Sequence, residues 1–479
     1  MGNVGKRSMV MKDPMKQLVA ILFWALAVYL AYLTGPWSKE ENASKMPLGP
    51  HDSMFHMHQP LHPDGKVTMQ GQFHLELAAA ANGTHRLWLS NAFRQEINPT
   101  GFNGQLTIEP VEGDAQHATF EQVGRSFELR AQVAPVKGQA WLTVSGKLGE
   151  LTDFEDVKFF WDYQTEALGL RPPLGLDPMI PRSPDNTLTS DKIDLGRELF
   201  FDTDMSADGA VSCATCHLPE RAFTDTNTIS VGIGGHKGRR NVPTALNSAY
   251  LKSFAWDGRA KSLEQYVRSP ILSDDEMGNR NEAEVVARLK TTYETRMQQA
   301  FDAPLSLDTI AKALACYQRT LFSGDSDFDR FEAGLKDAIG LSAQRGRALF
   351  FGRVGCGRCH VPPLFSDLGF HNLGVGWPDS GEPDLGRFLV TNDDNDRGAF
   401  KTPSLRDVSR TAPYMHDGSL ATLHDVVQFY NQGGTENPHL DTHIKPLGLV
   451  ASEVDDLVAF LKTLDGRLEI SSKETPRDR

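Results

Sequence analysis

The chain has 479 residues, which is too many for one compact core and predicts two or three domains. It is 40% hydrophobic and 23% charged, an ordinary composition for a globular protein that argues against wholesale disorder. The formal net charge of -13 argues against a nucleic-acid-binding protein, because such proteins usually present a basic face.

An apolar run of membrane-spanning length lies near the N-terminus. No charged residue interrupts Leu18 to Leu33, and the run extends to Trp37. Basic residues precede the run and glutamates follow it, which places the N-terminus in the cytoplasm and the rest of the chain outside. No clear small-x-small cleavage site is present, which favours an uncleaved anchor over a removed signal peptide. The sequence therefore predicts a cytoplasmic N-terminus at 1–16 and a transmembrane anchor at 17–37.

Residues 38–65 are polar and predict a linker that is rich in histidine and methionine. Imidazole and thioether groups suit copper in an exported protein, so a copper site is one interpretation of this segment. A polar linker without a metal is the other interpretation. The histidines and methionines that crowd together are His51, Met54, His56, Met57, His58 and His62.

Residues 66–165 predict a small all-β domain. Short segments alternate apolar and polar residues, and Gly, Asn and Pro separate them, which is typical of an antiparallel β-sandwich. A Pro-rich stretch follows and predicts a linker at 166–185. Beyond it, apolar residues recur at helical spacing and strand signals nearly vanish. The predicted fold is therefore mainly α-helical, with a transmembrane helix and a β-sandwich in front.

The helical part contains an internal repeat. Gly196 to Phe201 (GRELFF) precedes one C-x-x-C-H motif, and Gly346 to Phe351 (GRALFF) precedes another. In both copies a short predicted helix runs into the motif. Two copies of one unit predict two similar α-helical domains, at residues 186–325 and 326–479.

The two C-x-x-C-H motifs indicate covalent haem attachment. Two thiols three positions apart can each add to a vinyl group of one porphyrin. The adjoining histidine then lies beneath the ring as an iron ligand. The motif residues are Cys213, Cys216 and His217 in the first copy, and Cys356, Cys359 and His360 in the second.

Three other uses of paired cysteines fit the pattern less well. A thioredoxin-like redox pair needs a strand-to-helix context, which is missing here. A zinc site would leave the trailing histidines unexplained, and a disulfide within C-x-x-C closes a strained loop. The fifth cysteine, Cys316, falls beside the apolar stripe of a predicted helix, where a buried and inert thiol is expected.

A set of further motifs surrounds the two cysteine pairs. They are LGRELFFD, SCATCH, RRNVPTALN, FAWDGRAKSLEQ, GCGRCH, FKTPSLRD, TAPYMHDG and TLHDVVQFYNQGG, with Glu-Met-Gly at 276–278. Through these motifs the region 176–466 resembles the bacterial dihaem cytochrome c peroxidase superfamily, which includes the MauG-type enzymes. Residues 1–170 lie outside the resemblance. The resemblance implies two cytochrome c-like helical haem domains, each with one covalently bound haem c, and His217 and His360 as the proximal iron ligands.

The resemblance also implies the residues of a reaction site. Trp256 matches a tryptophan that lies between the two haems and relays electrons. Glu276 matches the distal residue that takes a proton from peroxide and returns it to the leaving hydroxyl, and Pro270 matches a residue beside it. The positions that match a calcium site built from oxygen atoms are Asn241, Thr411 and Pro413.

Three positions depart from a pattern found in the superfamily, and the first two bear on which branch the chain resembles. Tyr430 stands where a methionine binds the second haem in one branch, and a tyrosine there resembles the MauG-type enzymes. A core tyrosine bonded elsewhere is the alternative. Ile233 replaces a histidine that blocks the first iron, so that iron is expected to be open, unless a loop shift brings His236 to it. Tyr266 stands where the family usually shows glutamine.

The resemblance implies a peroxidase-type oxidoreductase that uses hydrogen peroxide as its oxidant. In the MauG-like interpretation, a high-valent dihaem state oxidises a periplasmic electron donor or modifies a protein substrate. The alternatives are a cytochrome c peroxidase that reduces peroxide to water and a non-catalytic, copper-linked electron carrier. The apolar run and its flanking charges predict an inner-membrane anchor, and the resemblance to bacterial enzymes implies catalytic domains in the periplasm.

Overall fold

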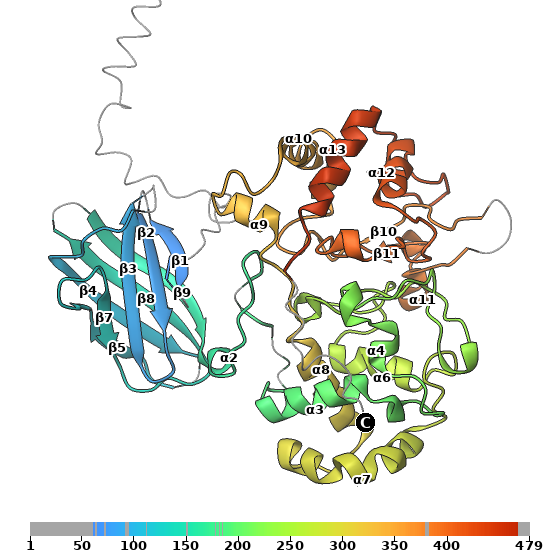
Figure 1. Cartoon of the computed structure of the whole chain (residues 1–479), viewed down its shortest axis with the longest axis horizontal. Coiled ribbons are helices and arrows are strands. Elements are labelled where there is room, and N and C mark those ends of the chain that lie inside the picture. Colours follow the sequence, from blue (N-terminus) through green and yellow to red (C-terminus); the bar gives the residue numbers. More distant parts are fainter. Residues whose placement is uncertain are drawn as a thin grey trace, which may run out of the picture.

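The computed structural model describes residues 61–467, apart from gaps at 63–64, 71–72, 92–94, 112, 150–151, 178, 182, 184 and 379–382. The predicted cytoplasmic N-terminus, the membrane anchor and most of the histidine- and methionine-rich linker lie outside the described residues. Within those residues, no helix is both long enough and apolar enough to span a membrane. A β-rich unit stands beside a larger helical body (Figure 1).

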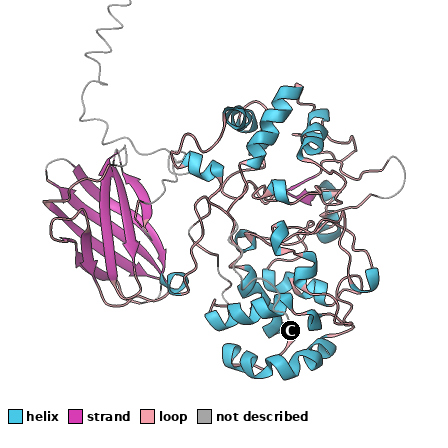
Figure 2. Ribbon diagram, in the orientation of Figure 1, coloured by secondary structure: helices cyan, strands magenta, loops and turns pink. Residues whose placement is uncertain are grey.

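The β-rich unit is a sandwich of two antiparallel sheets, as predicted (Figure 2). Along β8, Ala140, Leu142 and Val144 are buried, while the intervening Trp141 is 47% exposed. Buried residues of both sheets share one core between them. The first sheet orders β1 (Lys66–Gln70), β2 (Phe73–Ala79), β3 (Thr84–Asn91), β7 (Leu129–Gln132) and β6 (Glu121–Gln122). The second orders β5 (Gln116–Thr119), β4 (Phe102–Pro110), β8 (Gln139–Leu148) and β9 (Thr152–Asp162).

The connection after the sandwich is fixed to the helical body. It begins with α2 (Tyr163–Ala167) and continues through the Pro-rich stretch. The Arg406 guanidinium donates to the carbonyl of Gly175 and pairs with Asp329, and both side chains of that ion pair are 2% exposed. A methyl group on Gly175 would lie 2.0 Å from the Asp329 carboxylate. Close packing around a buried charge pair therefore holds this part of the connection in place.

The helical body consists of two units that follow the same plan (Figure 1). The first unit contains α3 (Ser190–Phe201), α4 (Cys213–Cys216), α5 (Leu263–Tyr266), α6 (Arg268–Ile271), α7 (Glu282–Phe301) and α8 (Leu307–Gln318). The second contains α9 (Asp327–Glu332), α10 (Leu341–Phe351), α11 (Phe388–Thr391), α12 (Leu423–Gln432) and α13 (Ala451–Lys462). Two short strands, β10 (Phe370–His371) and β11 (Phe400–Lys401), pair within the second unit.

The sequence repeat corresponds to one helix crossing that occurs twice. A Cβ atom placed on Gly196 of α3 would lie 1.9 Å from the carbonyl oxygen of Ala313 in α8. A Cβ atom on Gly346 of α10 would lie 1.9 Å from the carbonyl oxygen of Asp456 in α13. In each unit, glycine therefore allows the helix before the C-x-x-C-H motif to touch the backbone of the unit's last long helix.

Two backbone hydrogen bonds, one in each direction, join the units. The N–H of Asn241 in the first unit donates to the carbonyl of His416 in the second, at 2.7 Å. The N–H of Lys401 in the second unit donates to the carbonyl of Trp256 in the first, at 2.8 Å. Asn241 and Lys401 occupy matching positions in the two units, and so do Trp256 and His416. The two hydrogen bonds are therefore reciprocal.

Candidate active site

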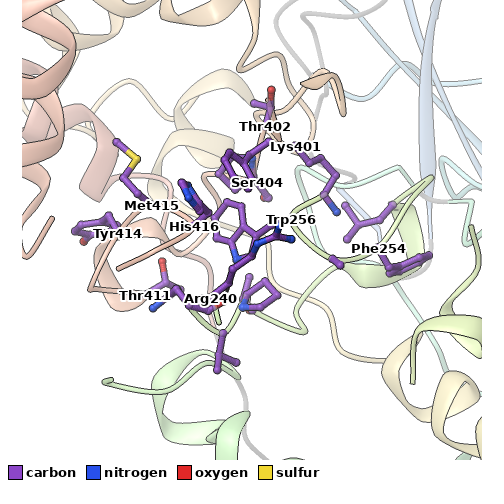
Figure 3. Close-up of a pocket in the computed structure, with 18 of the residues that line it drawn as sticks. Arg240, Phe254, Trp256, Lys401, Thr402, Ser404, Thr411, Tyr414, Met415 and His416 are labelled. Atoms are coloured by element: carbon purple, nitrogen blue, oxygen red, sulfur yellow. Dashed lines mark hydrogen bonds between the residues drawn. The ribbon is translucent and has the colours of Figure 1, made fainter. Parts of the chain in front are cut away.

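A cavity of about 900 Å³ lies between the two helical units. Its volume is at the upper end for pockets that hold a small molecule or cofactor. Figure 3 shows the part of its wall near Trp256 and His416. The residues predicted for the haem, reaction and calcium sites all line this cavity: Cys213, Cys216, His217, Asn241, Trp256, Pro270, Glu276, Cys356, Cys359, His360, Thr411, Pro413 and Tyr430.

Both motif histidines are held in the same tautomer. Nδ1 of His217 lies 2.9 Å from the carbonyl oxygen of Phe223, and Nδ1 of His360 lies 2.8 Å from that of Phe365. A carbonyl only accepts, so Nδ1 carries the proton in each ring and Nε2 keeps its lone pair. Burial lowers the pKa of both imidazoles, which keeps them neutral. Each ring is therefore ready to bind a metal through Nε2.

The four motif cysteines line the cavity and are half-buried. Burial raises the pKa of Cys213 and Cys356 to about 12 and that of Cys216 to about 11. Thiols of this kind stay protonated, unlike the low-pKa thiolates of redox pairs and zinc sites. All four motif cysteines are free in the structure. Paired thiols, a histidine with a free Nε2 and a large cavity together form a donor set that fits covalently bound haem in each unit.

Glu276 and Pro270 lie together on the cavity wall of the first unit. The carbonyl of Pro270 accepts the N–H of Met277, which holds the turn that carries Glu276. A Cβ atom on Gly232 would lie 2.6 Å from the Cα of Glu276, so a second loop packs closely against this turn. Burial raises the pKa of the Glu276 carboxyl, and the charge of Arg259 opposes that shift in part. A carboxyl with a raised pKa is suited to proton transfer near neutral pH.

Tyr430 faces the second motif from the last turn of α12. Leu423 and Val427, on the same helix face, are buried in the core of the second unit. Burial raises the pKa of the Tyr430 phenol, and the nearby Cys356 and Cys359 raise it further. The phenol thus lies near the cysteines that would tether a haem in this unit.

Trp256 lies where the two units meet (Figure 3). Its indole Nε1 donates to the carbonyl of Asn241 at 2.8 Å, so the ring is fixed in orientation. Arg240 stabilises the turn that carries Trp256, because it pairs with Asp257 of that turn and with Asp384 of the second unit. The indole is therefore part of the contact between the units as well as of the cavity wall.

The three residues predicted to bind calcium all line the cavity. The amide nitrogen of Asn241 donates to the carbonyls of Asn227 and Thr228, at 3.1 and 3.2 Å. This leaves the side-chain oxygen of Asn241 as the atom that can bind a cation. Thr411 and Pro413 belong to the opposing turn of the second unit.

Two further sequence interpretations concern residues away from the cavity. His236 is 62% exposed, and its Nδ1 lies 4.0 Å from Asp275, so its side chain points into solvent. It does not belong to the cavity lining. Cys316 is fully buried, and its thiol contacts the Asn186 side chain, which confirms the expected buried thiol.

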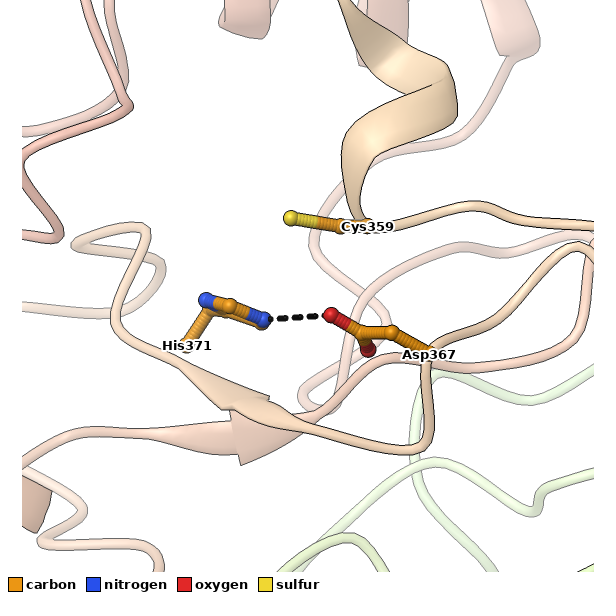
Figure 4. A group of neighbouring side chains, drawn as sticks. All are labelled: Cys359, Asp367 and His371. Atoms are coloured by element: carbon orange, nitrogen blue, oxygen red, sulfur yellow. Dashed lines mark hydrogen bonds and ion pairs between the residues drawn. The ribbon is translucent and has the colours of Figure 1, made fainter. Parts of the chain in front are cut away.

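A group of side chains that the sequence did not predict lies beside the second motif. His371 bridges Asp441, at 2.6 Å, and Asp367, at 3.0 Å, next to Cys359 (Figure 4). Cys359, Asp367 and His371 are close enough to hold a metal ion. Haem attachment would convert the Cys359 thiol to a thioether and remove that ligand set. No spacing rule links His371 to Asp441, because the two residues meet only through tertiary folding.

A sequence model described as di-haem cytochrome c peroxidase matches residues 190–337. The chain is 44% identical over 291 residues to the methylamine utilization protein MauG of Methylorubrum extorquens, covering 60% of this chain and 81% of that protein. The chain belongs to the dihaem cytochrome c peroxidase/MauG family. The predicted family and its enzyme class, a peroxidase-type oxidoreductase, are thereby confirmed, and the family supports two haem c cofactors.

Other relatives show how far this family assignment reaches. The chain is 40% identical over 326 residues to cytochrome-c peroxidase IdrP1 of Denitromonas iodatirespirans, covering 61% of this chain and 86% of that protein. The crystal structure of a MauG-like protein associated with microbial copper homeostasis matches with a TM-score of 0.57 and 37% identity, covering 63% of this chain and 97% of that one. MauG and the named peroxidases are similarly close, so kinship alone does not separate the two branches.

Proposed function

We propose that this family member reacts with peroxide in the first unit and passes oxidising equivalents to the second unit in a MauG-like manner. His217 and His360 would hold the two haems from below, with the motif cysteines as tethers and Tyr430 as the second haem's other ligand. When bound, haem iron supplies the electron transfer that peroxide cleavage requires. The observation that carries this proposal is that residues from both units converge on one cavity, with both histidines fixed for metal binding.

Glu276 would move the proton that peroxide cleavage requires. Its carboxylate takes a proton from one peroxide oxygen and returns it to the leaving hydroxyl. The buried position favours this exchange, because the pKa of the carboxyl is raised above its ordinary value. Trp256, whose indole donates to the carbonyl of Asn241, would relay electrons between the units.

Replacing the carboxyl of Glu276 tests the proton-transfer role. Glu276→Gln is expected to slow the reaction with peroxide about 10²–10⁴-fold, because an amide cannot accept the proton. In the wild type, the rate should fall as the pH drops through the raised pKa of Glu276, since the carboxylate is the active form. The measurement is stopped-flow absorbance at several pH values.

The matched control for this test is Asp274→Asn, which removes an exposed carboxylate two positions away, outside the cavity lining. It should leave both the rate and the pH profile unchanged. An unaltered pH profile in Glu276→Gln would contradict the assigned role.

Tyr430 supports the MauG-like branch of the proposal. A phenolate oxygen stabilises ferric and higher oxidation states, whereas a methionine sulfur raises the potential and suits an electron entry port. Similarity to IdrP1 favours the second candidate, a peroxidase that reduces peroxide to water at the expense of an electron donor. Oxygen insertion or cross-linking in a partner protein, seen as a mass shift, would support the first. Steady oxidation of a reduced cytochrome c would support the second.

Replacing Tyr430 tests iron ligation in the second unit. Tyr430→Met is expected to raise the midpoint potential of one haem and to change its absorption spectrum, because a thioether favours ferrous iron. Tyr430→Phe is the control that keeps the ring and removes the oxygen, and it should change the spectrum without supplying a ligand. Spectroelectrochemical titration measures both effects. An unchanged spectrum in Tyr430→Met would exclude ligation by Tyr430.

We also propose that the protein binds calcium and copper and that it is anchored in the inner membrane. The free oxygen of the Asn241 amide supports calcium between the units, with Thr411 and Pro413. The histidine- and methionine-rich segment supports copper, and one related structure is described as associated with microbial copper homeostasis. Elemental analysis of the purified protein should find both metals, and the absence of either would contradict its site.

The apolar run at 17–37 supports an inner-membrane anchor with periplasmic catalytic domains, which protease accessibility in spheroplasts tests.

A further inference from the structure

Tyr266 lines the part of the cavity where peroxide is proposed to bind, beside Glu276. The resemblance leads us to expect glutamine at this position. It ends the short helix α5 and lines the cavity with Pro270 and Glu276. Its ring stacks on Phe254, with centroids 5.9 Å apart and an angle of 22° between the planes. Phe254 belongs to the turn that carries Trp256, so this contact fixes the ring against a rigid part of the wall.

The hydroxyl of Tyr266 is directed to the cavity rather than to the protein. Within residues 61–467 as described, it forms no hydrogen bond. Burial raises the pKa of the phenol to about 12, with a further contribution from the charge of Glu276, so the group stays protonated at neutral pH. A half-buried hydroxyl that lines a cavity and has no protein partner is available to hydrogen-bond a molecule bound there.

We propose that the Tyr266 hydroxyl donates a hydrogen bond to the peroxide that binds beside Glu276. The ionised carboxylate of Glu276 only accepts hydrogen bonds, so it leaves the negative charge that develops on peroxide without a donor. Arg259 is a less suitable donor, because its side chain is 47% exposed and paired with Asp257. Tyr266 thus positions the oxidant and Glu276 moves its proton. This inference rests on the proposed reaction in the first unit.

Packing alone would give Tyr266 a different role, and two substitutions separate the alternatives. Tyr266→Phe keeps the ring that stacks on Phe254 and removes the donor. Tyr266→Gln loses the ring and keeps an N–H donor near the same place. A hydrogen-bonding role predicts that glutamine preserves function better than phenylalanine, whereas a packing role predicts the reverse order.

Fluoride binding to the ferric holoprotein tests the inference without turnover. Fluoride occupies an open iron and accepts hydrogen bonds from nearby donors, and absorbance titration gives its Kd. Tyr266→Phe is expected to weaken fluoride binding about tenfold, the loss of one hydrogen bond, while Tyr266→Gln stays close to the wild type. The control Tyr250→Phe removes a phenol that donates to the carbonyl of Asp177 outside the cavity, and should leave the Kd unchanged.

The outcomes distinguish this inference from the proposal beneath it. Equal fluoride affinity in the wild type and Tyr266→Phe would overturn the hydrogen bond while leaving the open iron intact. Weaker binding in Tyr266→Gln than in Tyr266→Phe would overturn it in favour of packing. A wild-type protein that binds no fluoride would overturn the open first iron, and with it the inference.

Discussion

Two reciprocal backbone hydrogen bonds between the helical units are the constraint on which the site depends. Asn241 donates to the carbonyl of His416, and Lys401 donates to the carbonyl of Trp256. Because these bonds run in both directions, neither unit can shift along the other without breaking one of them. They fix the two halves of the cavity wall, the Trp256 indole and the proposed calcium ligands relative to one another. Each unit contains its own C-x-x-C-H motif, and the two hydrogen bonds fix the orientation of one motif relative to the other.

The two units are built alike, and the different roles proposed for them rest on a few residues that differ. Both histidines donate from Nδ1 to a backbone carbonyl, so the proximal sides are alike. The rest of the cavity wall differs, since Glu276 lines it in the first unit and Tyr430 lines it in the second. A proton-transfer group suits a place where peroxide is cleaved, and an oxygen ligand suits a place where oxidising equivalents are held. The repeat thus supplies the scaffold, and a few substitutions supply the asymmetry.

Local patterns made much of this predictable from the sequence. The C-x-x-C-H spacing and the repeated GRxLFF segments place the motifs, and alternation along the strands predicts the sandwich. Contacts between distant residues were not predictable, because no local pattern encodes them. The bridge from His371 to Asp441 and the seat of Gly175 against Asp329 are examples. The matching turns around Trp256 and His416 (WDG and HDG) were a visible signal that the repeat extends beyond the cysteine motifs.

The central claim is that two tethered haems differ in ligation, with one iron open to peroxide. Electron paramagnetic resonance of the purified ferric protein, before and after one equivalent of peroxide, tests it most directly. The account predicts one high-spin and one low-spin ferric signal, both of which decrease when peroxide is added. Two low-spin signals that are indifferent to peroxide would contradict it.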